Sequence, residues 1–319
     1  MARAKSGHDI LLSLDRYGRK DLELLPDLVT RRTRTGAVAQ WLLLAVVLLW
    51  LASLFIGNPN LDMGVIGTFL FSPIILDGLF NTLIIAICAQ LLAMVLGVIV
   101  GYGRLSSRSA PRVTSWLFVW FFRSTPLIVQ LLIWGNLSLF IPRLGFGEWS
   151  ASTNDVMSPF VASVIALGIH DAAYLAEIVR SGVQSVSAGQ KEAASALGLT
   201  WWQAQRRVVL PQALRVMIPA AGSFFVLLLK STSLVVVIAG GDLLTQAQNI
   251  SAYNFKVIEL LLVATIWFLV ITTLSSVGQS FLERRFSRQL RPRRERQPEG
   301  MRALSKTDDG AQPQAKDKE

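Results

Sequence analysis

Four ionisable side chains interrupt otherwise apolar stretches of this chain. Arg123, Asp171 and Lys230 stand deep in their runs, and Glu177 follows Asp171 after one and a half helical turns. A charge at such depth in a membrane is costly unless it is paired or faces water. Two cations and two carboxylates could bind the carboxylate and the ammonium group of a zwitterionic solute, so all four are candidate pathway residues. The alternative is structural: Asp171 pairs with Arg123 or Lys230, and Glu177 pairs with Arg180, which is the interpretation we favour for Glu177.

A polar segment between two apolar runs, Gln184–Val216, is the second feature whose residue types suggest a function. A Ser-x-x-Gln capping box predicts a helix from Ser187, and Gly198 can take the left-handed conformation that ends it. A second capping signal starts at Thr200, and we expect that helix to stop at Pro211. The segment therefore predicts two short helices joined at a glycine, a shape suited to docking a partner.

The alternative for this segment is a polar loop lying on lipid, with Trp201 and Trp202 as interfacial anchors. Anchoring on lipid requires neither the Ala193-Ala194 pair nor a glycine that stops a helix. Small alanines would let one helix enter a cleft, and Glu192 could meet a basic groove on a partner. We therefore prefer the docking interpretation.

The elements that must position these residues are membrane helices. Hydrophobic residues make up 52% of the 319 residues and charged residues 16%, and the mean hydropathy is +0.47. Helices are expected because backbone groups in lipid must be satisfied within the segment. We predict six transmembrane helices, in the apolar runs Thr35–Leu61, Gly78–Gly103, Val113–Ile141, Val156–Val179, Val216–Gly240 and Leu260–Leu282.

The formal net charge of +10 reports topology and gives no reason to expect a nucleic-acid partner. Lys and Arg gather before residue 37, in 104–112, in 180–215 and after residue 282, which are alternate connections. The positive-inside rule then places both termini in the cytoplasm of a bacterium, with a multi-pass chain in the inner membrane. The basic tail could also contact anionic membrane lipid.

The sequence lacks the residue patterns that several kinds of chemistry require. Cys88 is the single cysteine, and the two histidines are far apart, so we expect no disulfide and no metal site. The sequence has no Gly-x4-Gly-Lys-Ser/Thr loop to hold ATP. An intramembrane enzyme would need a Ser/His/Asp, His-Glu-x2-His or paired-Asp arrangement, and none is recognisable. We expect no cofactor in this chain, and any energy from ATP must come from another subunit.

Ordered motifs resemble those of a known family. The string Glu192-Ala193-Ala194-x3-Gly198-x9-Val208-x-Leu210-Pro211 is similar to the "EAA" coupling loop of ABC-importer permeases. The further segments FNTL, FRSTPLIVQ, AAYLAEIVRSGVQS, VVLPQALR and LLKSTSLVVVI resemble, in order, the polar-amino-acid uptake permeases, of the histidine, glutamine and arginine type.

This resemblance implies a type I importer core of five helices, preceded here by one extra N-terminal helix. It implies that six residues of the loop couple ATP hydrolysis on the partner subunits to transport: Glu192, Ala193, Ala194, Gly198, Leu210 and Pro211. It also implies a pair of ATP-binding subunits, a periplasmic solute-binding protein, a second permease copy or paralogue, and a small polar amino acid or zwitterion as substrate. The chain itself would be a transporter subunit and not an enzyme.

The expected organisation follows from these segments. Residues 1–36 form a basic cytoplasmic arm, 37–75 the extra helix with its external loop, and 76–285 the permease domain, with the coupling loop at 184–216. Residues 286–319 form a disordered cytoplasmic tail. An ion-coupled secondary transporter or channel using Asp171 and Glu177 is the alternative function, which inverted repeats would support, and we find none.

Overall fold

The computed structural model describes residues 34–55, 58, 61–147 and 150–287. The chain divides into two compact units, residues 1–62 and 63–319. In the first unit, α3 (Arg34–Phe55) is an apolar helix whose large side chains, such as Trp41 and Leu49, are exposed. Such a surface fits the span predicted in this stretch, which stays a prediction. The predictions for the arm before Arg34 and for the tail beyond Ser287 lie outside the described residues.

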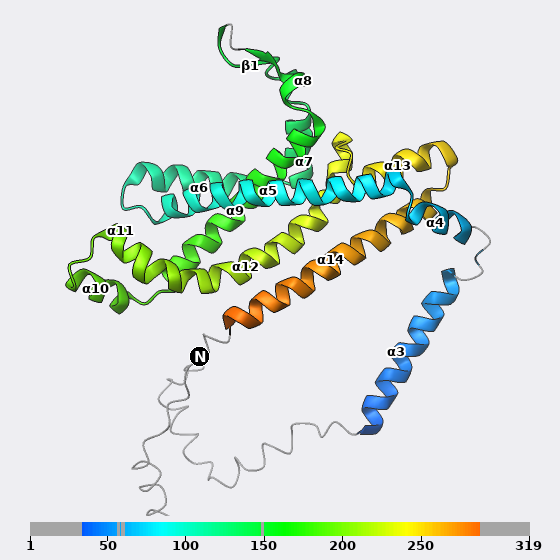
Figure 1. Ribbon diagram of the computed structural model, residues 1–319, viewed down its shortest axis with the longest axis horizontal. Coiled ribbons are helices and arrows are strands. Elements are labelled where there is room, and N and C mark those ends of the chain that lie inside the picture. Colours follow the sequence, from blue (N-terminus) through cyan, green and yellow to red (C-terminus); the bar gives the residue numbers. More distant parts are fainter. Residues whose placement is uncertain (1–33, 56–57, 59–60, 148–149, 288–319) are drawn as a thin grey trace, which may run out of the picture. The chain divides into compact units, whose positions relative to one another are not determined.

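The second unit is helical, apart from one short antiparallel strand pair, in the residues that the structure describes (Figure 1). Its elements are α4 (Met63–Leu70), α5 (Pro73–Leu105), α6 (Ser109–Ser124), α7 (Leu127–Gly135), the 3-10 helix η2 (Leu137–Leu139), β1 (Arg143–Leu144), β2 (Ala151–Ser152), α8 (Thr153–Val156), α9 (Pro159–Gln184), α10 (Ala188–Ala196), α11 (Trp201–Ala204), the π-helix η4 (Gln205–Val209), α12 (Leu210–Ser231), the 3-10 helix η5 (Thr232–Ile238), α13 (Leu243–Asn254) and α14 (Val257–Ser287).

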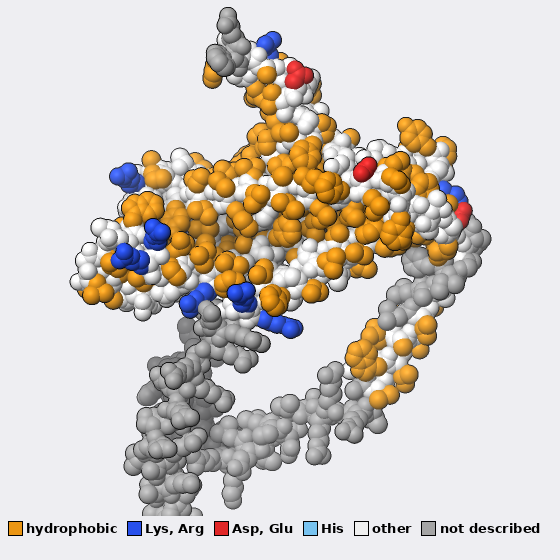
Figure 2. All heavy atoms as spheres, in the orientation of Figure 1, with side chains coloured by type: hydrophobic (Ala, Val, Ile, Leu, Met, Phe, Trp, Pro, Cys, Tyr) orange, Lys and Arg blue, Asp and Glu red, His pale blue; other side chains and the backbone are white. Residues whose placement is uncertain are grey.

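Four stretches of described residues are long and apolar enough to cross a membrane: α5, α9, the run Trp201–Ile238 and most of α14. The bent pair α6–α7 makes a fifth if it counts as one span. The visible face of this unit is covered with hydrophobic side chains (Figure 2). This is an all-α membrane fold with up to five spans in its core, and a sixth span is not established.

The predicted span 113–141 contains Pro126, which is expected to kink a membrane helix, and the structure breaks the helix at this residue. Helices α6 and α7 form a pair bent by 101°. At the bend, Thr125 and Pro126 are extended, with ψ angles of 137° and 134°. Proline cannot donate a backbone hydrogen bond and disfavours a helical conformation in the residue before it, so the helix breaks here.

A buried glutamine repairs this break. The Nε2 amide of Gln130 donates to the carbonyl oxygens of Phe122 at 3.1 Å and Thr125 at 3.2 Å, and to the Thr125 hydroxyl at 2.7 Å. In an unbroken helix the Phe122 carbonyl would accept from the N–H of Pro126, which does not exist. Gln130 supplies the missing donor and so allows a broken helix among apolar elements.

Close packing of α5 on α9 positions the helix that carries two of the four ionisable candidates. A Cβ atom added at Gly97 would lie 2.7 Å from Cβ of Leu175, and one added at Gly101 would lie 2.7 Å from Cβ of Val179. Both distances are too short for any side chain, so the Gly-x3-Gly spacing lets the two helices approach closely.

Candidate functional site

Helix α10 ends as the sequence predicts. Gly198 has a φ of +72°. The Leu199 N–H donates to the Ala194 carbonyl at 3.1 Å, and the Gly198 N–H donates to the Ser195 carbonyl at 2.9 Å. These two bonds define a Schellman motif, in which glycine is favoured at the left-handed position. The predicted helix stop at Gly198 is confirmed.

One of the two predicted capping boxes is formed in the structure and the other is not. At Thr200 the box is complete: the Thr200 hydroxyl accepts from the Gln203 N–H at 3.4 Å, and Gln203 Oε1 accepts from the Thr200 N–H at 2.9 Å. Ser187 is the N-cap of α10, but its side chain accepts no hydrogen bond. The predicted start of α10 is therefore right and its predicted capping box is wrong.

The second helix does not stop at Pro211, and this prediction is also wrong. Helix α11 continues through η4 into α12, so one helical run extends from Trp201 to Ile238. Pro211 is the second residue of α12 and lies inside this run, where its missing N–H removes one helical hydrogen bond. The π-turn of Gln205–Val209 directly before it widens the helix. The second half of the coupling loop is therefore continuous with a membrane-spanning helix.

The residues of the coupling-loop string lie on two faces of α10 and its turn. Glu192, Ala193 and Gly198 are exposed, whereas Ala194 is buried at 2% exposure. Leu197, which the sequence reasoning did not single out, is 80% exposed beside the glycine turn. An exposed leucine next to two small residues makes this face suitable for insertion into a partner.

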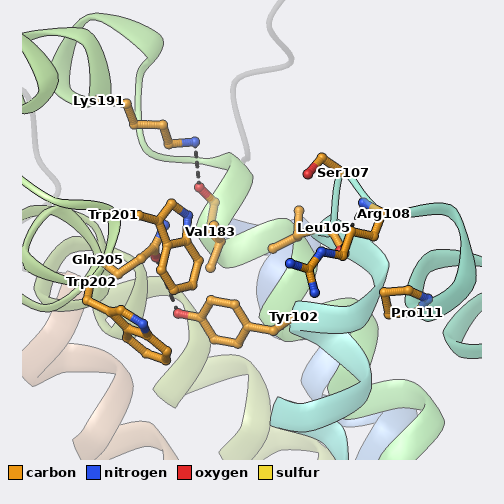
Figure 3. Close-up of a pocket in the computed structure, with 11 residues that line it drawn as sticks. Tyr102, Leu105, Ser107, Arg108, Pro111, Val183, Lys191, Trp201, Trp202 and Gln205 are labelled. Carbon is orange, nitrogen blue, oxygen red and sulfur yellow. Dashed lines mark hydrogen bonds between the residues drawn. The ribbon is translucent and has the colours of Figure 1, made fainter.

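A cavity of about 810 Å³ lies between α11 and the α5–α6 turn (Figure 3). Trp201 and Trp202 stand on one side, Tyr102 lies between, and Arg108 stands on the other side (Figure 3). The rings of Trp201 and Tyr102 make an edge contact with centroids 6.3 Å apart. The tryptophans proposed as lipid anchors are thus wall residues of a cavity, although both remain more than half exposed.

Glu177 stands in an ion network at the coupling-loop end of α9. Its carboxylate lies 3.1 Å from Arg104 of α5 and 2.7 Å from Arg180. Arg180 also donates to the side-chain oxygen of Gln184 at 2.6 Å. The structural alternative for Glu177 is therefore the arrangement seen. Arg104, the partner that sequence spacing could not reveal, comes from a different helix.

Asp171 is buried on α9, at 7% exposure. Its Oδ2 atom has no hydrogen-bond partner in the described chain. No ion pair within 4.0 Å joins it to Arg123 or Lys230 among the described residues. The Arg123 guanidinium instead lies 5.0 Å from the ring centroid of Tyr174, a cation–π distance. The structural alternative for Asp171, an ion pair with Arg123 or Lys230, is not formed among the described residues.

Aromatic rings surround these charges. Tyr174 contacts His170 and Phe224, with ring centroids 5.3 Å and 5.4 Å apart, and so links α9 to α12. His170 Nδ1 is buried without a hydrogen-bond partner in the described chain. Arg123 therefore lies against the ring of Tyr174, which follows Asp171 by about one turn of α9.

Lys230 belongs to a different surface. It lines a hollow of about 350 Å³ between α12 and α14, together with hydroxyl-bearing residues of α14 such as Thr272, Thr273 and Ser276. Lys230 is exposed there. The four predicted pathway residues thus occupy three environments, and only Arg123 and Asp171 are associated through a shared neighbour.

Comparison with known proteins decides the family. Residues 93–288 match the binding-protein-dependent transport system inner membrane component family. The chain belongs to this family. The matched region contains the whole coupling loop and all four ionisable candidates.

Relatives support the same membership. The arginine transport system permease protein ArgU of Corynebacterium glutamicum is 36% identical, over 78% of this chain and 80% of its own length. The glutamine transport system permease protein GlnP of Escherichia coli is 33% identical, over 67% of this chain and 93% of its own. A crystal structure of an amino acid ABC transporter with histidines matches with a TM-score of 0.59 and 32% identity, over 67% of this chain and 94% of that one.

Membership settles the class of protein. This chain is the membrane permease component of an ABC importer, and it is a multi-pass membrane protein. The described helices agree with the type I permease fold of the solved amino acid transporter. The polar segment around Gly198 lies within the region that matches the family.

Proposed function

We propose that this permease imports polar amino acids or related small zwitterions, driven by ATP. It acts with a second permease copy or paralogue, a pair of ATP-binding subunits that hydrolyse ATP, and a periplasmic solute-binding protein. One observation carries the proposal: an exposed helix–glycine–helix loop whose second half is continuous with a membrane-spanning helix. Such a loop can transmit motion from a partner into the membrane.

The packing of α9 against η4 and α12 at the end of the loop can carry this motion into the membrane helices. Val209 of η4 and Ala213 of α12 are buried against Val179 and Val183 of α9. The helix that enters the loop and the helix that leaves it are thus packed together at the loop end. Because close-packed elements shift as units, displacement of α10 and α11 moves both α9 and α12. Closure of the ATP-binding subunits would in this way alternate access to the chamber.

The residues around Tyr174 provide the chemistry for a zwitterion. The buried Asp171 carboxylate offers an acceptor for an ammonium group, and Arg123 offers a planar donor for a carboxylate. Asp171 Oδ2 and His170 Nδ1 are buried and have no hydrogen-bond partner among the residues that the structure describes, as fits groups that bind a solute. Glu177 is held by two arginines, and we assign it a structural role. Lys230 remains a candidate on the separate α12–α14 surface.

The solute class draws on the relatives, since their names give arginine and glutamine as transported solutes. Both are polar amino acids that carry the ammonium and carboxylate groups for which Asp171 and Arg123 are suited. The proposed substrates are therefore polar amino acids.

The orientation in the membrane follows from charge. We propose that both termini and the coupling loop face the cytoplasm, and that 57–77, 142–158 and 241–253 face outward, because Lys and Arg are concentrated on the opposite connections. Arg143 is the one basic residue within those outward segments, and Lys256 follows the last of them.

The test is reconstitution. The ATP-binding subunits and the soluble binding protein that co-purify with the permease are identified, and amino acids are screened for binding to the soluble protein. The bound amino acid should then enter proteoliposomes only when ATP is present on the coupling-loop side. Uptake that follows a proton or sodium gradient without ATP would establish the ion-coupled alternative instead.

A further inference from the structure

A basic groove lies at the coupling-loop end of the membrane helices and includes both arginines of the Glu177 ion network. It has a volume of about 340 Å³ and is lined by side chains of α5, α6 and α9, namely Arg104, Arg112, Val113, Trp116, Arg180 and Gln184. Three of these six residues are arginines. Such a concentration of guanidinium groups at one end of a membrane bundle requires a counter-charge.

The chain itself supplies only part of that counter-charge. Glu177 binds both Arg104 and Arg180, so three arginines and one carboxylate leave a formal charge of +2. Arg112 is exposed, and its side chain has no ionic or hydrogen-bonding partner in the part of the chain that the structure describes. A guanidinium group has five N–H donors arranged in a plane, which suits the oxygens of a phosphate group.

The helix that carries Arg112 continues directly into apolar surface. Trp116 and Trp120 follow at intervals of four residues, and so lie on the same face of α6. Their rings are stacked, with centroids 6.2 Å apart and an interplanar angle of 10°, and both are about half exposed. A cation at the helix end, with aromatic rings one and two turns deeper, matches the headgroup and the upper acyl chain of a lipid.

We propose that this groove binds an anionic phospholipid, with its phosphate between Arg112 and Arg180 and an acyl chain along the Trp116–Trp120 stack. The lipid lies in the leaflet on the coupling-loop side, the cytoplasmic leaflet in the orientation proposed above. Arg180 also binds Gln184, the last residue of α9 before the coupling loop. Lipid bound here stabilises the end of α9, and anionic lipid therefore raises the rate of ATP-driven uptake.

This inference rests on the proposed importer function for its effect on uptake, but the binding itself can be measured separately. The purified permease with its ATP-binding subunits is placed in nanodiscs of equal parts phosphatidylglycerol and phosphatidylcholine, and the lipids retained after extraction are counted by native mass spectrometry. Wild type should retain phosphatidylglycerol in preference. Arg112→Gln should retain about fivefold less of it, the effect expected for losing a direct hydrogen-bonded contact with the phosphate.

Arg108→Gln is the matched control. Arg108 is an exposed basic residue one turn before Arg112 and does not line this groove, so its loss should leave retention unchanged. Arg112→Lys keeps the charge without the planar fork and should restore part of the retention, which separates lipid binding from misfolding. Free inorganic phosphate should not displace the lipid, because the acyl chain contributes to binding.

Four results would overturn the proposal: equal retention of the two lipids by wild type, equal loss in Arg108→Gln, displacement by inorganic phosphate, or separation of the permease pair in Arg112→Gln. The last would make the groove a contact with the second permease.

In proteoliposomes, wild-type uptake should be faster with phosphatidylglycerol than with phosphatidylcholine alone. Uptake that is absent in both lipids would contradict the importer function and leave the retention result standing.

Discussion

At the scale of single residues, the solute site that we propose depends on charged side chains that have no ionic partner among the described residues. Asp171 is buried without an ionic partner among the described residues, and Arg123 lies over the ring of Tyr174 instead. A buried carboxylate without a cation is costly, and the cost is offset when an ammonium group enters. The geometry thus favours a binding role for Asp171 over a structural one.

Asp171→Asn should therefore raise the solute concentration needed for half-maximal uptake by roughly tenfold, the loss of one hydrogen bond to a charged group. The amount of folded permease and the basal ATPase activity should stay near wild type, since no protein cation is left unpaired. Uptake of labelled solute across a range of concentrations measures the effect, with the exposed Asp155→Asn as control. Loss of folded protein in Asp171→Asn, without a change in half-maximal concentration, would show that the carboxylate is structural.

The glycine of the coupling loop allows a test of backbone conformation alone. No atom lies within 4 Å of a Cβ added at Gly198, but its φ of +72° is left-handed. A β-branched residue there costs about 1–2 kcal/mol, whereas asparagine tolerates this region. Gly198→Val should abolish most uptake, and Gly198→Asn should retain most of it, with both proteins present in the membrane. Equal loss in the two variants would point to a clash with the ATP-binding subunit and not to backbone strain.

At the scale of elements, close contact with α5 holds α9, the helix that carries Asp171, in place. A side chain at Gly101 would meet Val179 and the carbonyl of Ala176, at 2.7 Å and 2.9 Å. Gly278 of α14 has open space around it, since nothing lies within 4 Å of an added Cβ. The two positions therefore differ in packing, although both are helical glycines.

Gly101→Leu should lower stability by about 1–3 kcal/mol through overpacking, and should reduce uptake because α9 is displaced. Gly278→Leu should be neutral or slightly stabilising, because leucine favours helix over glycine. Thermal unfolding in detergent, followed by the fraction of monodisperse protein, compares the two. Equal melting temperatures would mean that α5 and α9 do not pack as closely as described.

Much of this architecture could be predicted from the sequence, because membrane helices are long and uniformly apolar. The helix stop at Gly198 could be predicted too, since glycine has a local conformational signature. The break at Pro126 is repaired by Gln130, and the Glu177 network includes Arg104 from another helix. Both depend on contacts between elements, which residue spacing does not contain. Pro211 predicts a helix end, but proline can also lie inside a continuous helical run, here just after a π-turn.

At the scale of the whole molecule, orientation and assembly decide how the site works. The coupling loop must face the compartment that holds ATP, and the chamber needs a second permease to enclose it. In the orientation that we propose from the distribution of basic residues, that loop and both termini face the cytoplasm. The groove around Arg112 then contacts the cytoplasmic leaflet, where anionic lipid would strengthen coupling.

Labelling tests this orientation. On a Cys88→Ala background, a cysteine in place of Gln190 in α10 should react with a membrane-impermeant maleimide only after the cells are opened. A cysteine in place of Gly147, in the outward segment 142–158, should react in intact cells. Both positions are exposed, so access to the side chain is not limiting. Reaction at position 190 in intact cells would invert the whole topology.

The most direct test of the account is ATP-driven uptake in proteoliposomes that hold the permease, its co-purified ATP-binding subunits and the binding protein. Wild type should accumulate the amino acid that the binding protein binds, only with ATP on the coupling-loop side. Glu192→Lys should abolish this uptake while the protein remains folded, whereas Glu283→Lys, an exposed charge on α14, should not. Uptake without ATP, or wild-type uptake by Glu192→Lys, would contradict the claim that this loop couples ATP to amino acid import.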